Sequence, residues 1–193
     1  MRNFIWAEKY RPSKLEDLIL PGTTRDIFEK FIKDKNIPHL LFSGTVGTGK
    51  TTLSKILINS LDCESIEMNA SDERGIELVR SKIKQFAMMQ SFSKLKVILL
   101  DEADAMTPEA QDALKRTIEI YSQNTRFILT CNSINRIIPA IQSRCQIVEF
   151  KTLDKKHILK VLKSILDNEQ VKYVIDDLMA LIDDNFPKIR NMV

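Results

Sequence analysis

The sequence has few features of a metal-cluster, membrane or secreted protein. Its three cysteines, Cys63, Cys131 and Cys145, form no Cys-x-x-Cys pair and lie near no group of histidines, so a zinc site is not expected. No apolar run approaches the ~20 residues of a membrane span, and no long apolar stretch follows the N-terminus as in a secretory signal. Scattered thiols are typical of a reducing compartment. We expect a cytoplasmic protein, or a nuclear one if the source is eukaryotic, without a membrane partner.

The net charge is also small, with 29 Lys and Arg against 26 Asp and Glu. A surplus of +3 does not by itself indicate a nucleic-acid binder, because only local clustering of cations could do so. The sequence contains no repeat, low-complexity tract or Gly/Ser linker.

Short apolar runs alternate with helical patterns over the first 150 residues. Strands that alternate with helices favour right-handed crossovers and a parallel sheet covered on both faces, which is an α/β fold. The expected strands are 39–43, 65–69, 96–100, 126–131 and 147–150, and the expected helices are 51–61, 76–86, 108–121 and 134–142, the last interrupted at Pro139.

After Phe150 the pattern becomes helical only, with helices expected at 155–167 and 174–183 and a further start at Pro187. This change predicts a domain boundary near Lys151. We therefore expect a core of residues 1–151 and a helical lid of residues 152–193 that stops early in its third helix.

Residues 44–51, Gly-Thr-Val-Gly-Thr-Gly-Lys-Thr, match the P-loop pattern at every required position. Glycines let backbone N–H groups turn inward to phosphate oxygens, and the following helix directs its positive end at the same anion. Lys50 would reach the β- and γ-phosphates, and the Thr51 hydroxyl would hold Mg²⁺. The alternative is a glycine-rich turn, but the preceding strand and the following amphipathic helix favour a nucleotide site.

Four aliphatic residues, 97–100, are followed by Asp101 and Glu102. A buried parallel strand would deliver both carboxylates to the carboxyl edge of the sheet, where ligands of open α/β sheets bind. Asp101 would orient Mg²⁺ through water, and Glu102 would act as general base toward the attacking water. The alternative is an acidic helix cap at the surface.

Four motifs carry a family resemblance: Trp-Ala-Glu-Lys-Tyr-Arg-Pro at 6–12, Asn-Ala-Ser-Asp-Glu-Arg-Gly at 69–75, Asp-Glu-Ala-Asp-Ala-Met at 101–106 and Ser-Arg-Cys at 143–145. Together they resemble the small subunits of replication factor C, sliding-clamp loaders of the AAA+ class, over residues 4–193. The resemblance implies a P-loop AAA+ core with a five-stranded parallel sheet, a helical lid and normally a collar domain, which is expected to be absent from this sequence.

The resemblance also assigns roles to individual residues. Asn132 would be a sensor that aligns the attacking water, and Arg144 an arginine finger that acts in trans on a neighbouring subunit. Arg190 matches a second sensor by position, although Pro187 and Lys188 depart from the usual pattern before it. Thr45-Val46 likewise replace the usual Pro-Pro of the P-loop. The nucleotide-binding set is Glu8, Tyr10, Arg11, Pro12, Gly44, Thr45, Val46, Gly47, Thr48, Gly49, Lys50, Thr51, Thr52, Asn132 and Arg190.

Arg80 and Lys84 are four residues apart and share one helical face, and Ser71-Asp72 upstream resemble an N-terminal cap. From the residues alone, two such cations favour an ordinary solvated face. In the family this helix grips primer-template DNA, and Arg74 matches a position that links DNA contact to the catalytic glutamate, here Glu102. No role is assigned to His39 or His157.

The resulting hypothesis is an ATPase subunit of a clamp loader, which uses ATP binding and hydrolysis, with Mg²⁺, to load a ring-shaped clamp onto primer-template DNA. Its implied partners are a large subunit, further small subunits, the clamp and DNA, and hydrolysis by the isolated chain is expected to be weak. The alternatives are another AAA+ ATPase, such as a helicase loader, and an inactive nucleotide-binding fragment. No aromatic pore loop or substrate-binding insertion favours the first of these alternatives.

Overall fold

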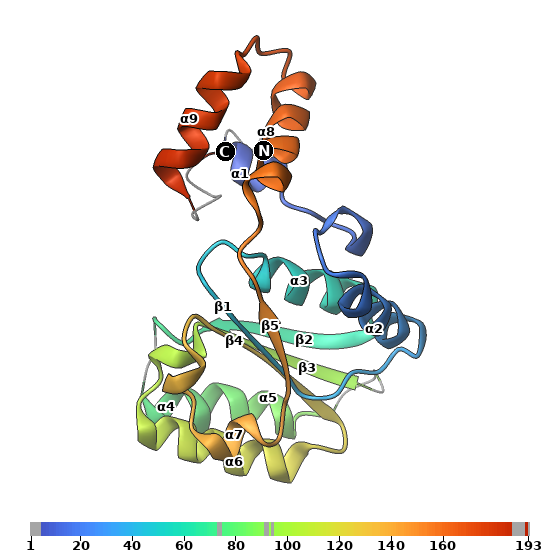
Figure 1. Ribbon diagram of the computed structural model, residues 1–193. Helices are drawn as coiled ribbons and strands as arrows, with labels where there is room; N and C mark the ends of the chain where they lie inside the picture. Colours follow the sequence, from blue (N-terminus) through green and yellow to red (C-terminus); the bar gives the residue numbers. More distant parts are fainter. Residues whose placement is uncertain (1–4, 73–74, 91–92, 94, 187–191, 193) are drawn as a thin grey trace.

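The computed structural model describes residues 5–72, 75–90, 93, 95–186 and 192, and of Leu78 and Arg80 only the backbone. Five parallel strands form one sheet, as expected: β1 (Leu40–Gly44), β2 (Cys63–Asn69), β3 (Leu95–Asp101), β4 (Thr125–Cys131) and β5 (Gln146–Phe150). Their order is β2-β3-β4-β1-β5, so β1 lies between β4 and β5 (Figure 1). Because all five strands run the same way, the segments that follow β1, β3 and β4 meet at one edge of the sheet.

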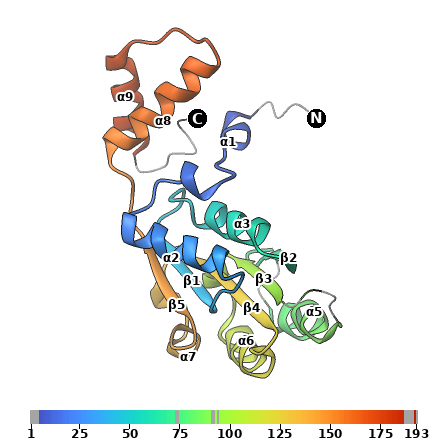
Figure 2. The ribbon, with the colours of Figure 1, turned by 90° about the vertical axis from the view of Figure 1, so that its right-hand side faces the viewer.

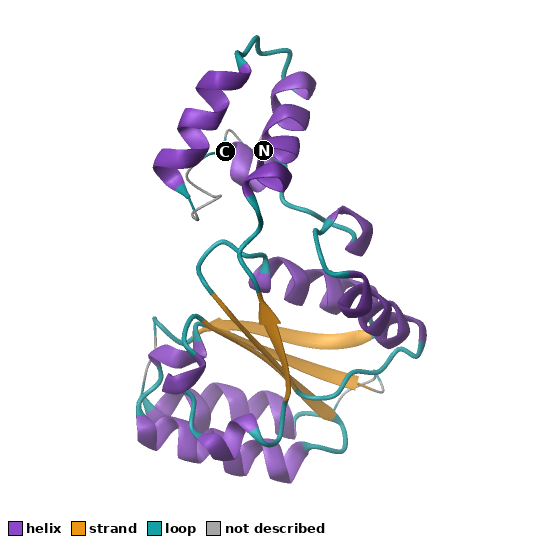
Figure 3. Ribbon diagram, viewed as in Figure 1, coloured by secondary structure: helices purple, strands orange, loops and turns teal. Residues whose placement is uncertain are grey.

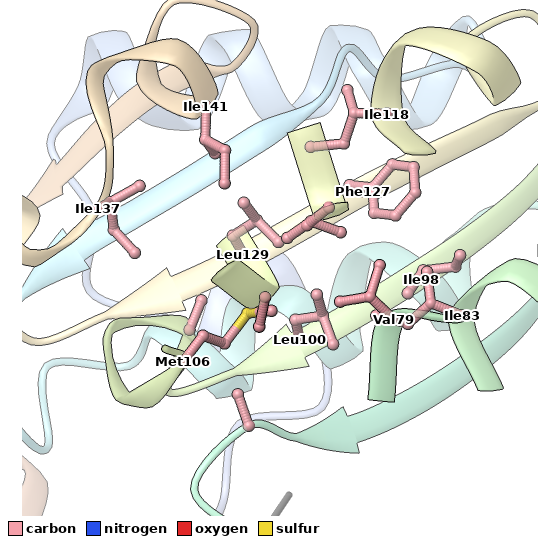
Figure 4. Packing of buried hydrophobic residues seen from close by; sticks show 14 of the residues in the cluster. Val79, Ile83, Ile98, Leu100, Met106, Ile118, Phe127, Leu129, Ile137 and Ile141 are labelled. Atoms are coloured by element: carbon pink, nitrogen blue, oxygen red, sulfur yellow. The ribbon is translucent and has the colours of Figure 1, made fainter. Parts of the chain in front are cut away.

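The central strands β1, β3 and β4 are buried on both faces, which explains why they read as continuous apolar runs. In β3, Val97 and Leu99 pack on one face of the sheet, and Ile98 and Leu100 pack on the other. All four are fully buried. Figure 4 shows the second of these two cores, in which Phe127 and Leu129 of β4 lie beside Ile98 and Leu100.

Helices cover both faces of the sheet (Figures 1 and 2). One face carries α2 (Gly22–Lys33) and α3 (Lys50–Ser60), and the opposite face carries α4 (Ile76–Leu78), a π-helical turn (Val79–Ile83), α5 (Lys84–Met88), α6 (Pro108–Tyr121) and α7 (Pro139–Gln142). Short 3₁₀ turns lie at Leu15–Asp17, Ala103–Ala105 and Ile134–Arg136.

Two further helices, α8 (Lys155–Asn168) and α9 (Ile175–Asn185), stand beyond the carboxyl edge of the sheet (Figure 3). They pack on each other through Ile158, Leu162 and Ile182. The short helix α1 (Trp6–Lys9) lies near the same end of the molecule. None of the helices in the described ranges has the length and apolar content needed to span a membrane. The division into a core of 1–151 and a lid of 152–193 remains a prediction.

Several local expectations were wrong. The helix α2 was not predicted, and the helix expected at 76–86 is interrupted by the π turn. The interruption expected at Pro139 within 134–142 is present: a 3₁₀ turn ends at Arg136, and α7 begins at Pro139, where the missing N–H of proline costs nothing. Ser71 and Asp72 do not cap a helix: their N–H groups bond to Asn69 in a turn, and Gly75 precedes α4.

Candidate nucleotide site

The loop between β1 and α3 has the backbone of a phosphate cradle. Gly49, directly before α3, has φ +96°, and Gly47 has φ +83°, both in the left-handed region. A Cβ on Gly44 would lie 2.3 Å from the carbonyl oxygen of Phe150, so the start of the loop admits only glycine. The N–H groups of the first turn of α3 then remain available to an anion.

Lys50 lies inside this loop with only 7% of its surface exposed. Its Nζ donates to the carbonyl oxygens of Gly44 at 2.7 Å and Thr45 at 2.8 Å, and to Asn132 Oδ1 at 3.2 Å. Burial lowers the pKa of Lys50, and nearby groups that include Asp101 oppose the shift. The ammonium group is therefore held inside the loop by neutral acceptors, which phosphate oxygens could replace.

The acidic end of β3 lies directly against the first turn of α3. The Thr51 hydroxyl donates to Asp101 at 2.9 Å for Oδ1 and 3.0 Å for Oδ2. The Thr130 hydroxyl on β4 also bonds to Asp101, which fixes the carboxylate from a second strand. A hydroxyl and a carboxylate side by side are hard oxygen ligands of the kind that Mg²⁺ prefers.

Glu102 occupies a left-handed backbone conformation with φ +56°. Such a conformation is uncommon for residues other than glycine and costs about 1 kcal/mol or more. It is held by the hydrogen bond from the Glu102 N–H to Thr130 Oγ1 at 3.0 Å. The turn places Glu102 and Asp101 together at the carboxyl edge of the sheet, as the sequence predicted.

Asn132 follows β4 at the same edge and accepts the hydrogen bond from Lys50 described above. Its backbone N–H, and that of Ser133, donate to Asp104 Oδ2 at 3.2 and 3.3 Å. Asp104 therefore holds the turn that presents Asn132. Sequence reasoning gave Asp104 no role, although it stands in the 101–106 motif, because only the folded chain brings it beside the end of β4.

A cavity of about 620 Å³ opens beside the loop. The N-terminal segment forms one wall, the P-loop and the start of α3 form the base, and α8 forms another wall. Of the described residues expected to bind nucleotide, those outside the lining are Glu8, Gly44, Thr45, Val46 and Asn132. Glu8 binds Arg11 at 2.7 Å, and Val46 is 58% exposed. The lining residues are Ala7, Tyr10, Arg11, Pro12, Ser13, Asp17, Leu18, Ile19, Gly47, Thr48, Gly49, Lys50, Thr51, Thr52, Leu153, Ile158, Lys160, Val161, Ser164 and Ile165.

Arg144 lies apart from this cavity, just after α7. Its guanidinium donates to the Ala140 carbonyl oxygen at 2.6 Å and pairs with Glu119 of α6. The side chain is about one-third exposed. The structure thus places Arg144 on the surface and away from its own chain's nucleotide loop, which is the placement that a role in trans requires.

Of the residues expected to contact DNA, Lys84 is an exposed residue at the start of α5. Arg80 belongs to the π turn, and its side chain is outside the description. Arg74 and Arg190 lie outside the described residues, as does the helix start expected at Pro187.

A family model described as "ATPase family associated with various cellular activities (AAA)" matches residues 40–153. Among solved structures, the Holliday junction branch migration motor RuvB of Thermotoga maritima superposes with a TM-score of 0.74, at 17% identity, over 93% of this chain and 62% of that one. At this identity the likeness shows the fold alone.

Several similar curated proteins are replication factor C subunits. The chain is 43% identical over 200 residues to the "Replication factor C small subunit" of Saccharolobus solfataricus, covering all of this chain and 61% of that protein. The identity is 49% over 190 residues to the protein of that name in Archaeoglobus fulgidus, covering 94% and 60%. It is 45% over 185 residues to "Replication factor C subunit 4" of Saccharomyces cerevisiae, covering 92% and 57%. The chain spans about three-fifths of the length of these relatives.

Proposed function

This chain belongs to the AAA family of ATPases, and we propose that it is the ATP-hydrolysing small subunit of a loader that places a ring-shaped sliding clamp on primer-template DNA. The observation that carries the proposal is that Lys50 and Thr51, which line the cavity, bond to Asn132 and to Asp101 respectively. These contacts assemble a phosphate loop, an acidic pair and a polar amide at one point. The clamp-loading part rests on the identity to proteins named replication factor C subunits.

MgATP would supply the phosphoryl group to be transferred and a metal charge that neutralises it. Lys50 would exchange its contacts with the Gly44 and Thr45 carbonyl oxygens for phosphate oxygens. Thr51 and Asp101 already lie within hydrogen-bond distance of each other, so they fit a shared Mg²⁺ ion, with Asp101 reaching it through water. The residues of the described lining that precede β1, such as Tyr10 and Pro12, would hold the base and sugar.

Glu102 would accept the proton of the attacking water, and Asn132 would align that water through its side-chain amide. The left-handed backbone of Glu102, held by its N–H bond to Thr130 Oγ1, fixes this residue directly beside Asp101. Preorganised polar groups of this kind need no rearrangement when charge develops.

Arg144 would act on the nucleotide of a neighbouring subunit. To do so it would leave Glu119, and an ion pair this exposed costs little to break. Hydrolysis would then depend on assembly with the large subunit and further small subunits. ATP binding would hold the clamp open and DNA bound, with Lys84, Arg80 and Arg74 on the DNA side, and hydrolysis would release both.

Nucleotide binding is tested by Lys50→Ala with Lys55→Ala as a matched control. Lys55 is on the same helix, and 38% of its side chain is exposed. It pairs with Glu67 at 2.9 Å and is not part of the cavity lining. Titration calorimetry with MgADP and a slowly hydrolysed ATP analogue should show binding by the parent chain and Lys55→Ala, and none or very weak binding by Lys50→Ala. Equal affinity of Lys50→Ala and the parent chain would remove the nucleotide site from this loop.

A further inference from the structure

The N-terminal wall of the nucleotide cavity has little anchorage of its own. It is formed by Ala7 and the stretch 10–13. All four residues of α1 are described, and none of them is buried. A wall that is not anchored in either of the two hydrophobic cores on the faces of the sheet must be held by contacts at its surface, or it will open.

One such contact joins this wall to the far end of α8. The Tyr10 hydroxyl donates to Glu169 Oε1 at 2.8 Å, across 159 residues of sequence. The Lys9 ammonium group bonds to the same oxygen and lies 5.3 Å from the centre of the Tyr10 ring. Glu169 directly follows α8 as its C-terminal cap residue. Two adjacent residues of the N-terminal segment thus meet one carboxylate.

The other end of this contact belongs to the opposite wall of the cavity. Ile158, Val161 and Ile165 of α8 line the cavity, whereas Glu169 is outside the described lining. A rigid helix connects these residues to Glu169, so any movement of α8 must either carry Tyr10 with it or break the Tyr10–Glu169 bond. The contact therefore couples the two walls that face each other across the cavity.

We infer that Glu169 is a positioning residue, a latch that ties the N-terminal segment to α8 and closes the cavity around a bound nucleotide. The inference rests on the proposed function in that the cavity is taken to hold a nucleotide. An isolated exposed ion pair would contribute little, and the side chain of Lys9 is 48% exposed. Glu169 is only 20% exposed, however, and it receives two hydrogen bonds, which are stronger when the acceptor is charged.

The ionisation of the cluster agrees with this geometry. The hydrogen bond from Lys9 is the largest cause that lowers the pKa of Glu169, followed by the bond from Tyr10. The same bond to Glu169 raises the pKa of Lys9. Near neutral pH the latch therefore consists of a carboxylate, an ammonium and a neutral phenol.

The chain carries its own reporter of the latch, because Trp6 is its one tryptophan and belongs to α1. Its side chain is half-buried. If the N-terminal segment leaves α8, the indole becomes more accessible to a neutral quencher such as acrylamide. The measurement needs no label and no nucleotide.

The test compares Glu169→Gln and Tyr10→Phe with the parent chain. Glu169→Gln keeps the shape of the side chain and removes its charge, and Tyr10→Phe keeps the ring against the cavity and removes the donor. Each should raise acrylamide quenching of Trp6 and weaken MgADP binding about 3- to 10-fold. The weakening should come mainly from faster dissociation in stopped-flow. The double variant should be hardly weaker than the worse single variant, because both remove one interaction.

The matched control is Asp167→Asn. Asp167 accepts a hydrogen bond from the Tyr173 hydroxyl at 3.1 Å, so the control removes the charge from a similar tyrosine–carboxylate bond at the same end of α8, one that does not involve the N-terminal segment. It should leave both Trp6 quenching and MgADP affinity at parental values.

Parental quenching and affinity in both Glu169→Gln and Tyr10→Phe would overturn the latch, as would equal effects in Asp167→Asn. Thermal unfolding followed by circular dichroism identifies a variant that fails to fold, and the remaining variant then decides the matter. If the parent chain binds no MgADP, the proposed function fails by itself, and Trp6 quenching in the absence of nucleotide still decides whether the latch exists.

Discussion

Acidification should destabilise the fold through His39, which precedes the strand that leads into the phosphate loop. The His39 Nδ1 accepts a hydrogen bond from the Phe127 N–H at 3.2 Å, so the folded chain requires a neutral ring. Burial, and secondly the charge of Arg126, lower the pKa of His39 to about 4. Protonation would remove the acceptor and add a second positive charge beside Arg126.

The sign follows from the two pKa values. In the unfolded chain the histidine pKa is ~6.5, so between these values the unfolded state binds more protons than the folded state. The free energy of unfolding therefore falls as the pH falls through this window. Above the window the ring is neutral in both states, so the histidine does not change the free energy of unfolding. Folded and unfolded pKa values of about 4 and ~6.5 correspond to a loss of at most about 2 kcal/mol at ~pH 5.

The assay is urea unfolding at ~pH 7.5 and ~pH 5, followed by circular dichroism, for the parent chain and His39→Asn. Asparagine offers its Oδ1 near the position of Nδ1 and does not titrate. The loss of stability on acidification should be smaller in His39→Asn by about 1–2 kcal/mol, allowing for the partial exposure of the ring. His157→Gln, which removes the chain's other histidine, should retain the parental loss. An identical loss in the parent chain and His39→Asn would refute the reasoning.

Glu102→Gln should keep MgATP affinity and lose turnover in an assembled complex, because an amide cannot take a proton from water; turnover at the parental rate would show that another group is the base. Mixing Glu102→Gln chains with Arg144→Ala chains should restore some of the ATPase activity that each lacks, since one kind of interface then has both groups, and no recovery in a steady-state assay would contradict action in trans. Lys84→Ala should flatten the log–log salt dependence of DNA binding by somewhat under ~1, whereas an unchanged slope would assign Lys84 to an ordinary solvated face. Gly44→Ala should lower the urea midpoint by the equivalent of ~2 kcal/mol or more, because its Cβ would meet the Phe150 carbonyl oxygen at 2.3 Å, and a parental midpoint would show that the backbone can move aside.

The local pattern of the sequence was enough to predict the five strands and the helices α3, α6, α8 and α9. Strands buried on both faces need continuous apolar runs, and α6 begins at a proline preceded by a capping threonine. The helix α2 escaped prediction although Phe28 is fully buried on it, because it begins at Pro21-Gly22, a pair that favours a turn. The π turn at Val79–Ile83 was not predicted either, because its residues continue a helical apolar pattern.

The sequence by itself determined the chemistry of the candidate site: a glycine-rich loop, a lysine, a hydroxyl and two carboxylates at strand ends, all of which follow from residue type and order. Tertiary structure alone decided the strand order that brings β1 between β4 and β5, and so which side chains meet. It joined Lys50 to Asn132 across 82 positions and placed Asp104 under the turn that holds Asn132. It also brought Glu169 to Tyr10 across 159 positions. Contacts between distant segments leave no periodicity in the chain, because their geometry is set by how the buried layers pack and by the direction of each strand end.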